Sequence, residues 1–186
     1  MTLYINCCPR PDSRTDQMAR ALLKKLGDYE ELRLYDEPLV PLDAQRLAKR
    51  DELLARRAYD DELFRYARQF AAARRIVIAA PYWDGSFPAL LKIYIENIYV
   101  PGLVTCYNEA GQPVGLCKAD TLCYVTTAGG PCDERFGYEY LKALAETSFG
   151  IRDVRLLKAE MLDIVGNDPQ AILQKALADY GLTEET

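Results

Sequence analysis

The sequence contains no histidine among its 186 residues. Histidine is the commonest general base and the usual partner of a nucleophilic serine or cysteine, so its absence excludes the Ser-His and Cys-His catalytic pairs. The six cysteines form no CxxC pair and have no histidine beside them, so zinc-site spacing is absent as well. We therefore predict neither a catalytic side chain nor a metal site, and we expect any enzyme chemistry to belong to a bound organic cofactor.

Two further absences narrow the class of protein. No apolar run approaches the roughly 18 residues that span a bilayer, and the initial MTLYINCC lacks a basic leader and a cleavage site. We therefore expect a cytoplasmic protein with free thiols and no membrane partner. The formal net charge of −5 also argues against a nucleic-acid partner, which would need a basic surface. A single small phosphate group is not excluded, because backbone N–H groups can hold it.

Apolar runs alternate with helical stripes along the chain, and the length suits a single domain over residues 1–186. The apolar runs predict strands at 2–8, 31–36, 74–81, 120–130 and 152–161. Helical spacing predicts helices at 14–26, 51–73, 88–99, 134–148 and 169–180, with a long loop at 37–50 and a hairpin at 103–118. This alternation predicts an α/β, flavodoxin-like three-layer sandwich: a five-stranded parallel sheet of order 2-1-3-4-5 with an extra hairpin after the third helix.

The predicted topology fixes where a ligand would bind. In an open α/β sheet the ligand lies beyond the carboxyl ends of the strands, where the strand order reverses. For this order the reversal falls between the first and third strands, with the fourth strand beside them. The loops of interest are CCPRPDSRTD, PYWDGSF and TTAGGPCDE.

The first of these loops leads into a helix. Ser13, Arg14 and Thr15 stand at the start of that helix, where hydroxyls, a guanidinium and unpaired backbone N–H groups suit a phosphate. The alternative is that Ser13 only caps the helix. Neither the Walker motif nor GxGxxG is present, which removes the two common nucleotide fingerprints.

The second loop places two flat side chains at the end of a buried strand. Tyr82 and Trp83, the only tryptophan, are followed by Asp84 and Gly85. An acid that accepts from a ring N–H and a glycine that permits close approach suit a planar ring on a phosphorylated stem. Two aromatic residues that belong to the core are the alternative.

The third loop offers hydrogen-bond donors. Thr126 and Thr127 carry hydroxyls, and Gly129 and Gly130 leave their backbone N–H groups uncovered. Such donors stabilise negative charge that develops on a bound ring during reduction. A plain turn is the alternative, since Gly-Gly-Pro is a common turn sequence.

Three segments carry a resemblance to a known family: NCCPRPDSRTDQMA, IVIAAPYWDGSFPALLKIYIENIYVPGLVTCY and YVTTAGGP. Taken together, they resemble the FMN-dependent NADH-azoreductase and NAD(P)H:quinone oxidoreductase family, and the similarity covers nearly the whole chain. The resemblance implies FMN as cofactor, NADH or NADPH as electron donor, a small-molecule acceptor and a homodimer. It also implies that the FMN phosphate is held by Cys8, Ser13, Arg14 and Thr15. By the same resemblance, the ribityl chain and ring would contact Pro81, Tyr82, Trp83, Asp84, Gly85, Thr126, Thr127, Ala128, Gly129 and Gly130.

Three residues depart from the family pattern. Cys8 replaces a frequent serine, and a thiol is a weaker phosphate donor than a hydroxyl. Asp84 replaces a frequent asparagine and would lower the flavin potential unless it is neutral or paired. Ala128 replaces a larger residue and would widen the substrate side.

These features support one leading hypothesis and two competitors. The leading hypothesis is an FMN-dependent oxidoreductase that takes a hydride from NAD(P)H and then reduces a quinone, azo or nitro compound in a ping-pong cycle. A flavodoxin-type one-electron carrier without substrate turnover is the alternative, and a flavin-free scaffold is a third option. The helix ALLKIYIENIYV is apolar almost all round, which favours cover by a partner chain, although cover by the chain's own hairpin is the alternative.

Overall fold

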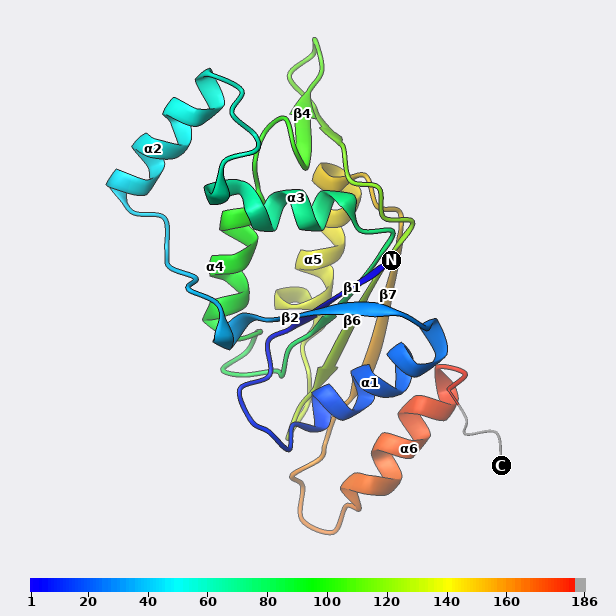
Figure 1. Cartoon of the computed structure of the whole chain (residues 1–186). Helices are drawn as coiled ribbons and strands as arrows, with labels where there is room; N and C mark the ends of the chain where they lie inside the picture. Colours follow the sequence, from blue (N-terminus) through cyan, green and yellow to red (C-terminus); the bar gives the residue numbers. More distant parts are fainter. Residues whose placement is uncertain (183–186) are drawn as a thin grey trace.

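A five-stranded parallel sheet forms the middle layer of the computed structural model, which describes residues 1–182 (Figure 1). Its strand order is β2-β1-β3-β6-β7, and every neighbouring pair is parallel. Because β4 and β5 form the separate hairpin, this order is the predicted 2-1-3-4-5 and confirms the expected fold. The five strands are β1 (Thr2–Asn6), β2 (Tyr29–Arg33), β3 (Arg75–Ala79), β6 (Thr121–Thr127) and β7 (Asp153–Ala159).

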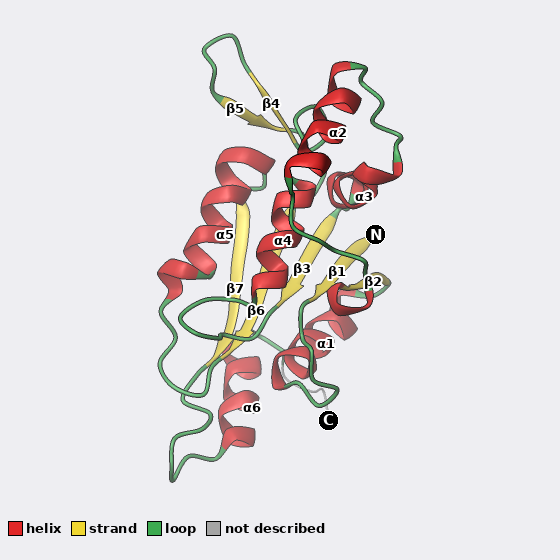
Figure 2. Cartoon of the chain, turned by 90° about the vertical axis from the view of Figure 1, so that its left-hand side faces the viewer, coloured by secondary structure: helices red, strands yellow, loops and turns green. Residues whose placement is uncertain are grey.

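Helices cover both faces of the sheet, as Figures 1 and 2 show. One face packs against α1 (Arg14–Leu26) and α6 (Pro169–Asp179), and the other against α3 (Arg65–Ala72), α4 (Ala89–Ile98) and α5 (Tyr138–Leu144). Successive residues of a strand point to opposite faces, so a strand covered on both sides must be apolar throughout. Strand β1 illustrates this: Leu3 and Ile5 lie in the core beneath α3 to α5, whereas Tyr4 lies in the core beneath α1.

The region between β2 and β3 differs from the prediction. Helix α2 (Ala44–Ala55) occupies much of the expected loop 37–50. The single helix expected at 51–73 is wrong, because that range holds the end of α2, a turn and then α3. Residues 1–182 therefore contain six α-helices. Asp43 begins α2, because its carboxylate accepts from the N–H of Arg46 at 2.8 Å. Arg57, with a φ of 54°, ends this segment, and a short turn η2 (Glu62–Phe64) leads into α3.

Two other boundaries are displaced. The second strand was expected at 31–36, but β2 ends at Arg33. The rest of the expected strand forms the short 3₁₀ turn η1 (Leu34–Asp36). The expected helix 134–148 is divided into a 3₁₀ turn η3 (Glu134–Phe136), helix α5 and a π-turn η4 (Ala145–Phe149) that ends at Gly150, whose φ is 80°.

The predicted hairpin is present and consists of β4 (Thr105–Tyr107) and β5 (Pro113–Gly115). It is fastened to the domain by the N–H of Cys117, which donates to the carbonyl of Phe149 at 3.3 Å.

All six cysteines are free. Burial raises the pKa of Cys7 and Cys117 to about 12 and that of Cys123 to about 11. Within residues 1–182, no helix is both long enough and apolar enough to cross a bilayer.

The apolar helix α4 is covered mainly by its own chain. Tyr94 and Ile98 are buried, and the helix packs against α3 and η1. From the segment expected to form the hairpin, Val104 belongs to the same core cluster and Cys117 packs against it. The side-chain amide of Asn97 holds the loop between η1 and α2 against the helix by donating to the carbonyl of Val40 at 3.2 Å. The surplus of apolar residues on α4 therefore does not by itself require a second chain.

We predict that Gly115→Ala destabilises the protein. A Cβ atom at this position would overlap the backbone of Phe149 and Gly150, which cannot move aside without separating the hairpin from the π-turn. The expected loss in the free energy of unfolding is about 1–3 kcal/mol, measured by denaturant titration. The neighbouring exposed Val114→Ala is the matched control and should change stability by less than about 0.5 kcal/mol. Equal stability of the two variants would contradict this packing.

Candidate functional site

A pocket of about 310 Å³ opens at the carboxyl ends of β1, β3 and β6. It confirms that the three loops expected to converge do so. Its lining consists of Pro9, Arg10, Asp12, Ser13, Arg14, Thr15, Pro81, Tyr82, Trp83, Thr127, Ala128, Gly129, Leu162 and Asp163.

The start of α1 forms the polar end of this pocket. The Ser13 hydroxyl caps the helix by accepting from the N–H of Asp16 at 3.3 Å. The N–H groups of the first turn, including those of Arg14 and Thr15, have no acceptor within the helix because none precedes them. They carry the partial positive charge of the helix terminus, which favours an anion. Ser13 is thus both a helix cap and a pocket residue, so the two alternatives for it are compatible.

A buried hydrogen bond joins two of the loops. The hydroxyl oxygens of Thr15 and Thr127 lie 2.6 Å apart, and the two residues are 1% and 9% exposed. This contact ties the first turn of α1 to the end of β6. It fixes the distance between the polar end of the pocket and the loop after β6.

The aromatic wall comes from the loop after β3. The N–H of Tyr82 donates to the carbonyl of Thr127 at 3.0 Å, and the Tyr82 hydroxyl accepts from the N–H of Asp133 at 3.3 Å. Tyr82 is therefore held between two loops. Trp83 is 40% exposed at the pocket, so the alternative of a core tryptophan is wrong. A flat, accessible side chain of this kind can contact a planar ring.

Asp84 and Gly85 do not line the pocket. They are the central residues of a tight turn, which is closed by two backbone hydrogen bonds between Trp83 and Ser86 of 2.7 and 2.9 Å. Both central residues have positive φ, 49° and 87°, as an Asp-Gly type I′ turn requires. The Asp-Gly pair is explained by this turn, which presents the neighbouring Trp83.

Cys8 is likewise outside the pocket lining. Its thiol lies 3.7 Å from the carbonyl of Ala79 in the core beneath α1, and its N–H donates to the Asn6 side chain at 2.9 Å. Burial raises the pKa of the Cys8 thiol to about 11. The side chain is buried in this core rather than exposed in the pocket.

Thr126 and Gly130 are the remaining predicted residues that the structure leaves outside the lining. Thr126 precedes Thr127 on β6, and the alternation of a strand directs the two side chains to opposite faces. The carbonyl of Gly130 accepts from the N–H of Met161 at 3.1 Å, so this glycine belongs to the junction with the next loop.

Sequence reasoning missed five lining residues. Pro9, Arg10 and Asp12 lie in the first loop but were not singled out, and Leu162 and Asp163 come from the loop after β7. The strand order carried a signal for this last loop, because β7 neighbours β6 and their carboxyl ends lie together.

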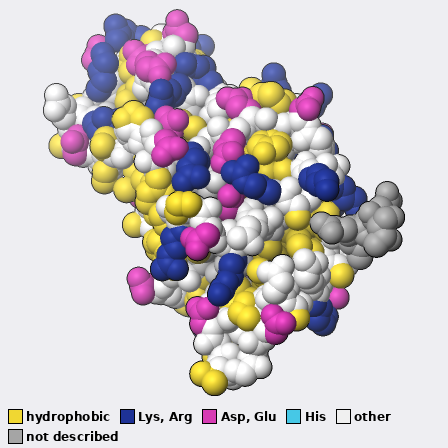
Figure 3. All heavy atoms as spheres, turned by 60° about the horizontal axis from the view of Figure 1, so that its bottom comes forward, with side chains coloured by type: hydrophobic (Ala, Val, Ile, Leu, Met, Phe, Trp, Pro, Cys, Tyr) yellow, Lys and Arg dark blue, Asp and Glu magenta, His cyan; other side chains and the backbone are white. Residues whose placement is uncertain are grey.

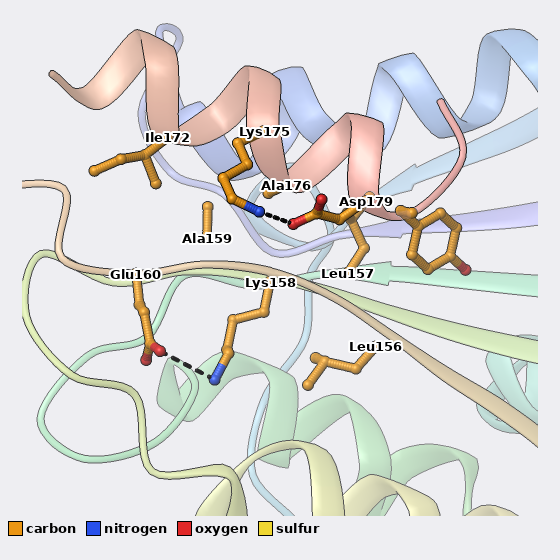
Figure 4. Close-up of a pocket in the computed structure, with 10 residues that line it drawn as sticks. Leu156, Leu157, Lys158, Ala159, Glu160, Ile172, Lys175, Ala176 and Asp179 are labelled. Atoms are coloured by element: carbon orange, nitrogen blue, oxygen red, sulfur yellow. Dashed lines mark hydrogen bonds and ion pairs between the residues drawn. The ribbon is translucent and has the colours of Figure 1, made fainter. Parts of the chain in front are cut away.

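A second, larger hollow lies along the edge of the sheet. It measures about 510 Å³ and runs between β7 and α6 (Figure 4). Its charged side chains pair with each other: Lys175 contacts Asp179 at 2.5 Å, and Lys158 contacts Glu160 at 3.4 Å. This groove lies beside the edge strand β7 and includes none of the loop residues that follow β1, β3 and β6, so we do not assign the ligand to it.

The electrostatics of the surface are mixed. On the face turned forward in Figure 3, basic and acidic side chains alternate rather than gather by sign. The pocket lining follows the same pattern, with Arg10 and Arg14 balanced by Asp12 and Asp163. Residues 1–182 contain no group of three or more acidic, cysteine or histidine side chains that could hold a metal ion.

Comparisons with known proteins agree with the fold and extend over most of the chain. The model of a family described by its flavodoxin-like fold matches residues 1–182. An FMN-dependent NADH:quinone oxidoreductase of Clostridium perfringens is 35% identical over 175 residues, which cover 88% of this chain and 87% of that protein. One of the same name from Coprothermobacter proteolyticus is 30% identical over 191 residues, covering 95% and 94%.

A shorter match has higher identity. FMN-dependent NADH:quinone oxidoreductase 2 of Clostridium acetobutylicum is 40% identical over 124 residues, which span 63% of this chain and only 61% of that protein.

Two solved structures support the fold. An azoreductase of Bacillus anthracis superposes with a TM-score of 0.82 at 20% identity, covering 96% of this chain and 95% of that one. An FMN-dependent NADH-azoreductase of the same species, solved in complex with FMN, gives 0.78 at 24% identity, covering 96% and 94%. The match over residues 1–182 and the long alignments to curated relatives lead to one conclusion: this chain belongs to the flavodoxin-like family that includes the FMN-dependent NADH:quinone oxidoreductases.

Proposed function

We propose that this protein is an FMN-dependent oxidoreductase that passes two electrons from NADH or NADPH to a quinone, azo or nitro acceptor in a ping-pong cycle. The observation that carries the proposal is the pocket itself, where the anion-favouring start of α1 and the aromatic wall of Tyr82 and Trp83 face one cavity. The names of the relatives from Clostridium perfringens and Coprothermobacter proteolyticus support the same cofactor, donor and acceptor.

The residues of the pocket fit a phosphorylated planar cofactor. Ser13, Arg14 and Thr15 supply hydroxyl, guanidinium and backbone N–H donors at one end. Pro81, Tyr82 and Trp83 supply apolar and aromatic surface next to them. A stem that carries a phosphate and a flat ring would match this order of polar and aromatic surface.

The protein's contribution would be to bind, orient and stabilise charge. Bound FMN would supply the redox chemistry, accepting a hydride from the nicotinamide and passing the electrons to the acceptor. Ala128 and Gly129 line the pocket in the loop after β6, and their backbone would contact the polar edge of the ring. Trp83 and Tyr82 would position the ring by contact alone, since we assign no side chain as a general acid.

We also propose that the protein works as a cytoplasmic homodimer. Trp83 is 40% exposed and Phe136 is 56% exposed. Their loops are joined by the Ser86 hydroxyl, which donates to the carbonyl of Phe136. Two accessible aromatic side chains on adjoining loops suit a partner surface that completes the acceptor side of the pocket. Sedimentation at micromolar concentration would identify the dimer, and a strictly monomeric active protein would contradict it.

The first prediction from this proposal concerns turnover. The purified protein should be yellow, or become yellow when FMN is added, and should oxidise NADH or NADPH in the presence of a quinone. Initial rates at several acceptor concentrations should give parallel double-reciprocal lines, as a ping-pong cycle requires. Protein that remains colourless and takes up no FMN would contradict the proposal. Protein that binds FMN but transfers only single electrons without turnover would indicate the electron carrier instead.

The second prediction concerns the phosphate end. Ser13→Ala removes a hydroxyl from the pocket and should weaken FMN binding roughly tenfold or more, because hydrogen bonds to charged groups are strong. Riboflavin, which lacks the phosphate, should bind both proteins equally. Asp168→Ala is the matched control: it removes the cap of α6, where the carboxylate accepts from the N–H groups of Gln170 and Ala171, and Asp168 does not line the pocket. If both variants lose FMN affinity equally, the effect belongs to helix capping and not to phosphate binding.

The third prediction separates Cys8 from the phosphate site. Since its thiol faces the carbonyl of Ala79, Cys8→Ser should leave the dissociation constant for FMN within about twofold. Isothermal titration of wild type and variant measures this. A large gain in affinity in the variant would show that the side chain at position 8 does contact the phosphate, as the family resemblance implied.

A further inference from the structure

The loop after β7 reaches into the phosphate end of the pocket, although the sequence did not single it out. Its residue Asp163 lines the pocket, and its carboxylate oxygen Oδ1 lies 2.8 Å from Nη1 of Arg14. The two residues are 149 positions apart in sequence. Arg14 is the first residue of α1, and its charge is partly balanced by Asp163 before any anion arrives.

The backbone holds Asp163 in this position. The N–H groups of Met161, Leu162 and Asp163 donate to the carbonyls of Gly130, Ala128 and Gly129, at 3.1, 3.2 and 2.9 Å. These three hydrogen bonds join the loop after β7 to the loop after β6. The location of the Asp163 backbone is therefore set by the sheet and does not depend on the exposed ion pair.

The lack of a side chain at position 129 leaves room for this carboxylate. A Cβ atom on Gly129 would clash with Oδ2 of Asp163. Gly129 has no positive φ that would by itself call for glycine. The glycine and the acid thus fit each other sterically, and the acid lies directly over the loop that would contact the cofactor.

We propose that Asp163 is an attenuating residue of the phosphate site: it competes with the cofactor phosphate for Arg14 and lowers the affinity for FMN. This inference rests on the proposed function. A phosphate and the Asp163 carboxylate are both acceptors that pair with a guanidinium fork, and they repel each other when both are ionised. Because the side chains of Arg14 and Asp163 are 41% and 68% exposed, solvent screens the pair and the effect is moderate.

The test uses the full-length protein freed of flavin and titrated with FMN or riboflavin at low salt. Asp163→Asn keeps the size of the side chain and removes its charge. It should tighten FMN binding about three- to tenfold and leave riboflavin binding unchanged. The gain should shrink when the salt concentration is raised to 0.5 M, about where screening suppresses exposed charges. Thermal unfolding of the flavin-free variant checks that it is folded.

Asp179→Asn is the matched control. It removes one charge from an exposed ion pair, Lys175–Asp179, whose two residues do not line the pocket. FMN affinity should not change in this control. In an Arg14→Gln background, Asp163→Asn should no longer tighten FMN binding, because the competition acts through Arg14.

Each other outcome overturns the inference. If Asp163→Asn weakens FMN binding, the carboxylate orients Arg14 and does not compete with the phosphate. If riboflavin gains affinity by the same factor, or if the gain persists without Arg14, the acid does not act on the phosphate through that guanidinium. Wild-type protein that binds neither flavin would overturn the proposed function itself, and this inference with it, whereas wild-type binding with an unchanged variant overturns the inference alone.

Discussion

The buried hydrogen bond between Thr15 and Thr127 is the contact on which the geometry of the pocket depends. It connects the first turn of a surface helix to the end of a central strand, and both hydroxyls are shielded from water. A buried hydroxyl without a partner costs about 1–3 kcal/mol, so each threonine requires the other. The start of α1 and the loop after β6 therefore keep a fixed separation, and the aromatic wall is fastened to the same strand end by the Tyr82 N–H.

The parallel order of the sheet supplies the rest of the arrangement. Since β1, β3, β6 and β7 run in one direction, their carboxyl ends and following loops meet at one edge. The sheet brings together residues as distant in sequence as Arg14 and Asp163 without any local sequence signal. The same edge carries equal numbers of acidic and basic lining residues, so selectivity for an anion depends on the orientation of hydrogen-bond donors more than on net charge.

Much of the fold could be predicted from the sequence, because the central strands are apolar on both faces and cannot be amphipathic helices. Strand β3 was predicted in this way, whereas the hairpin was predicted from the turn residues between Asn108 and Gln112. The break between α2 and α3 could not be predicted, because it occurs at Arg57. This residue has a positive φ, although a positive φ is usually marked in the sequence by a glycine. In the site, Asp84-Gly85 was interpreted as ligand-binding although the pair is also the strongest short signal for a tight turn. Asp163 was missed because only tertiary structure places it beside Arg14.

The burial of the cysteines has a chemical consequence for a protein of this proposed class. Quinones are electrophiles that add to sulfur, and the attacking species is the thiolate. Cys7, Cys8, Cys117 and Cys123 all have pKa values raised to about 11 or 12 by the surrounding core, so at neutral pH their sulfur atoms stay protonated. A quinone that would alkylate an ordinary exposed cysteine thus meets a protonated sulfur atom at these four positions.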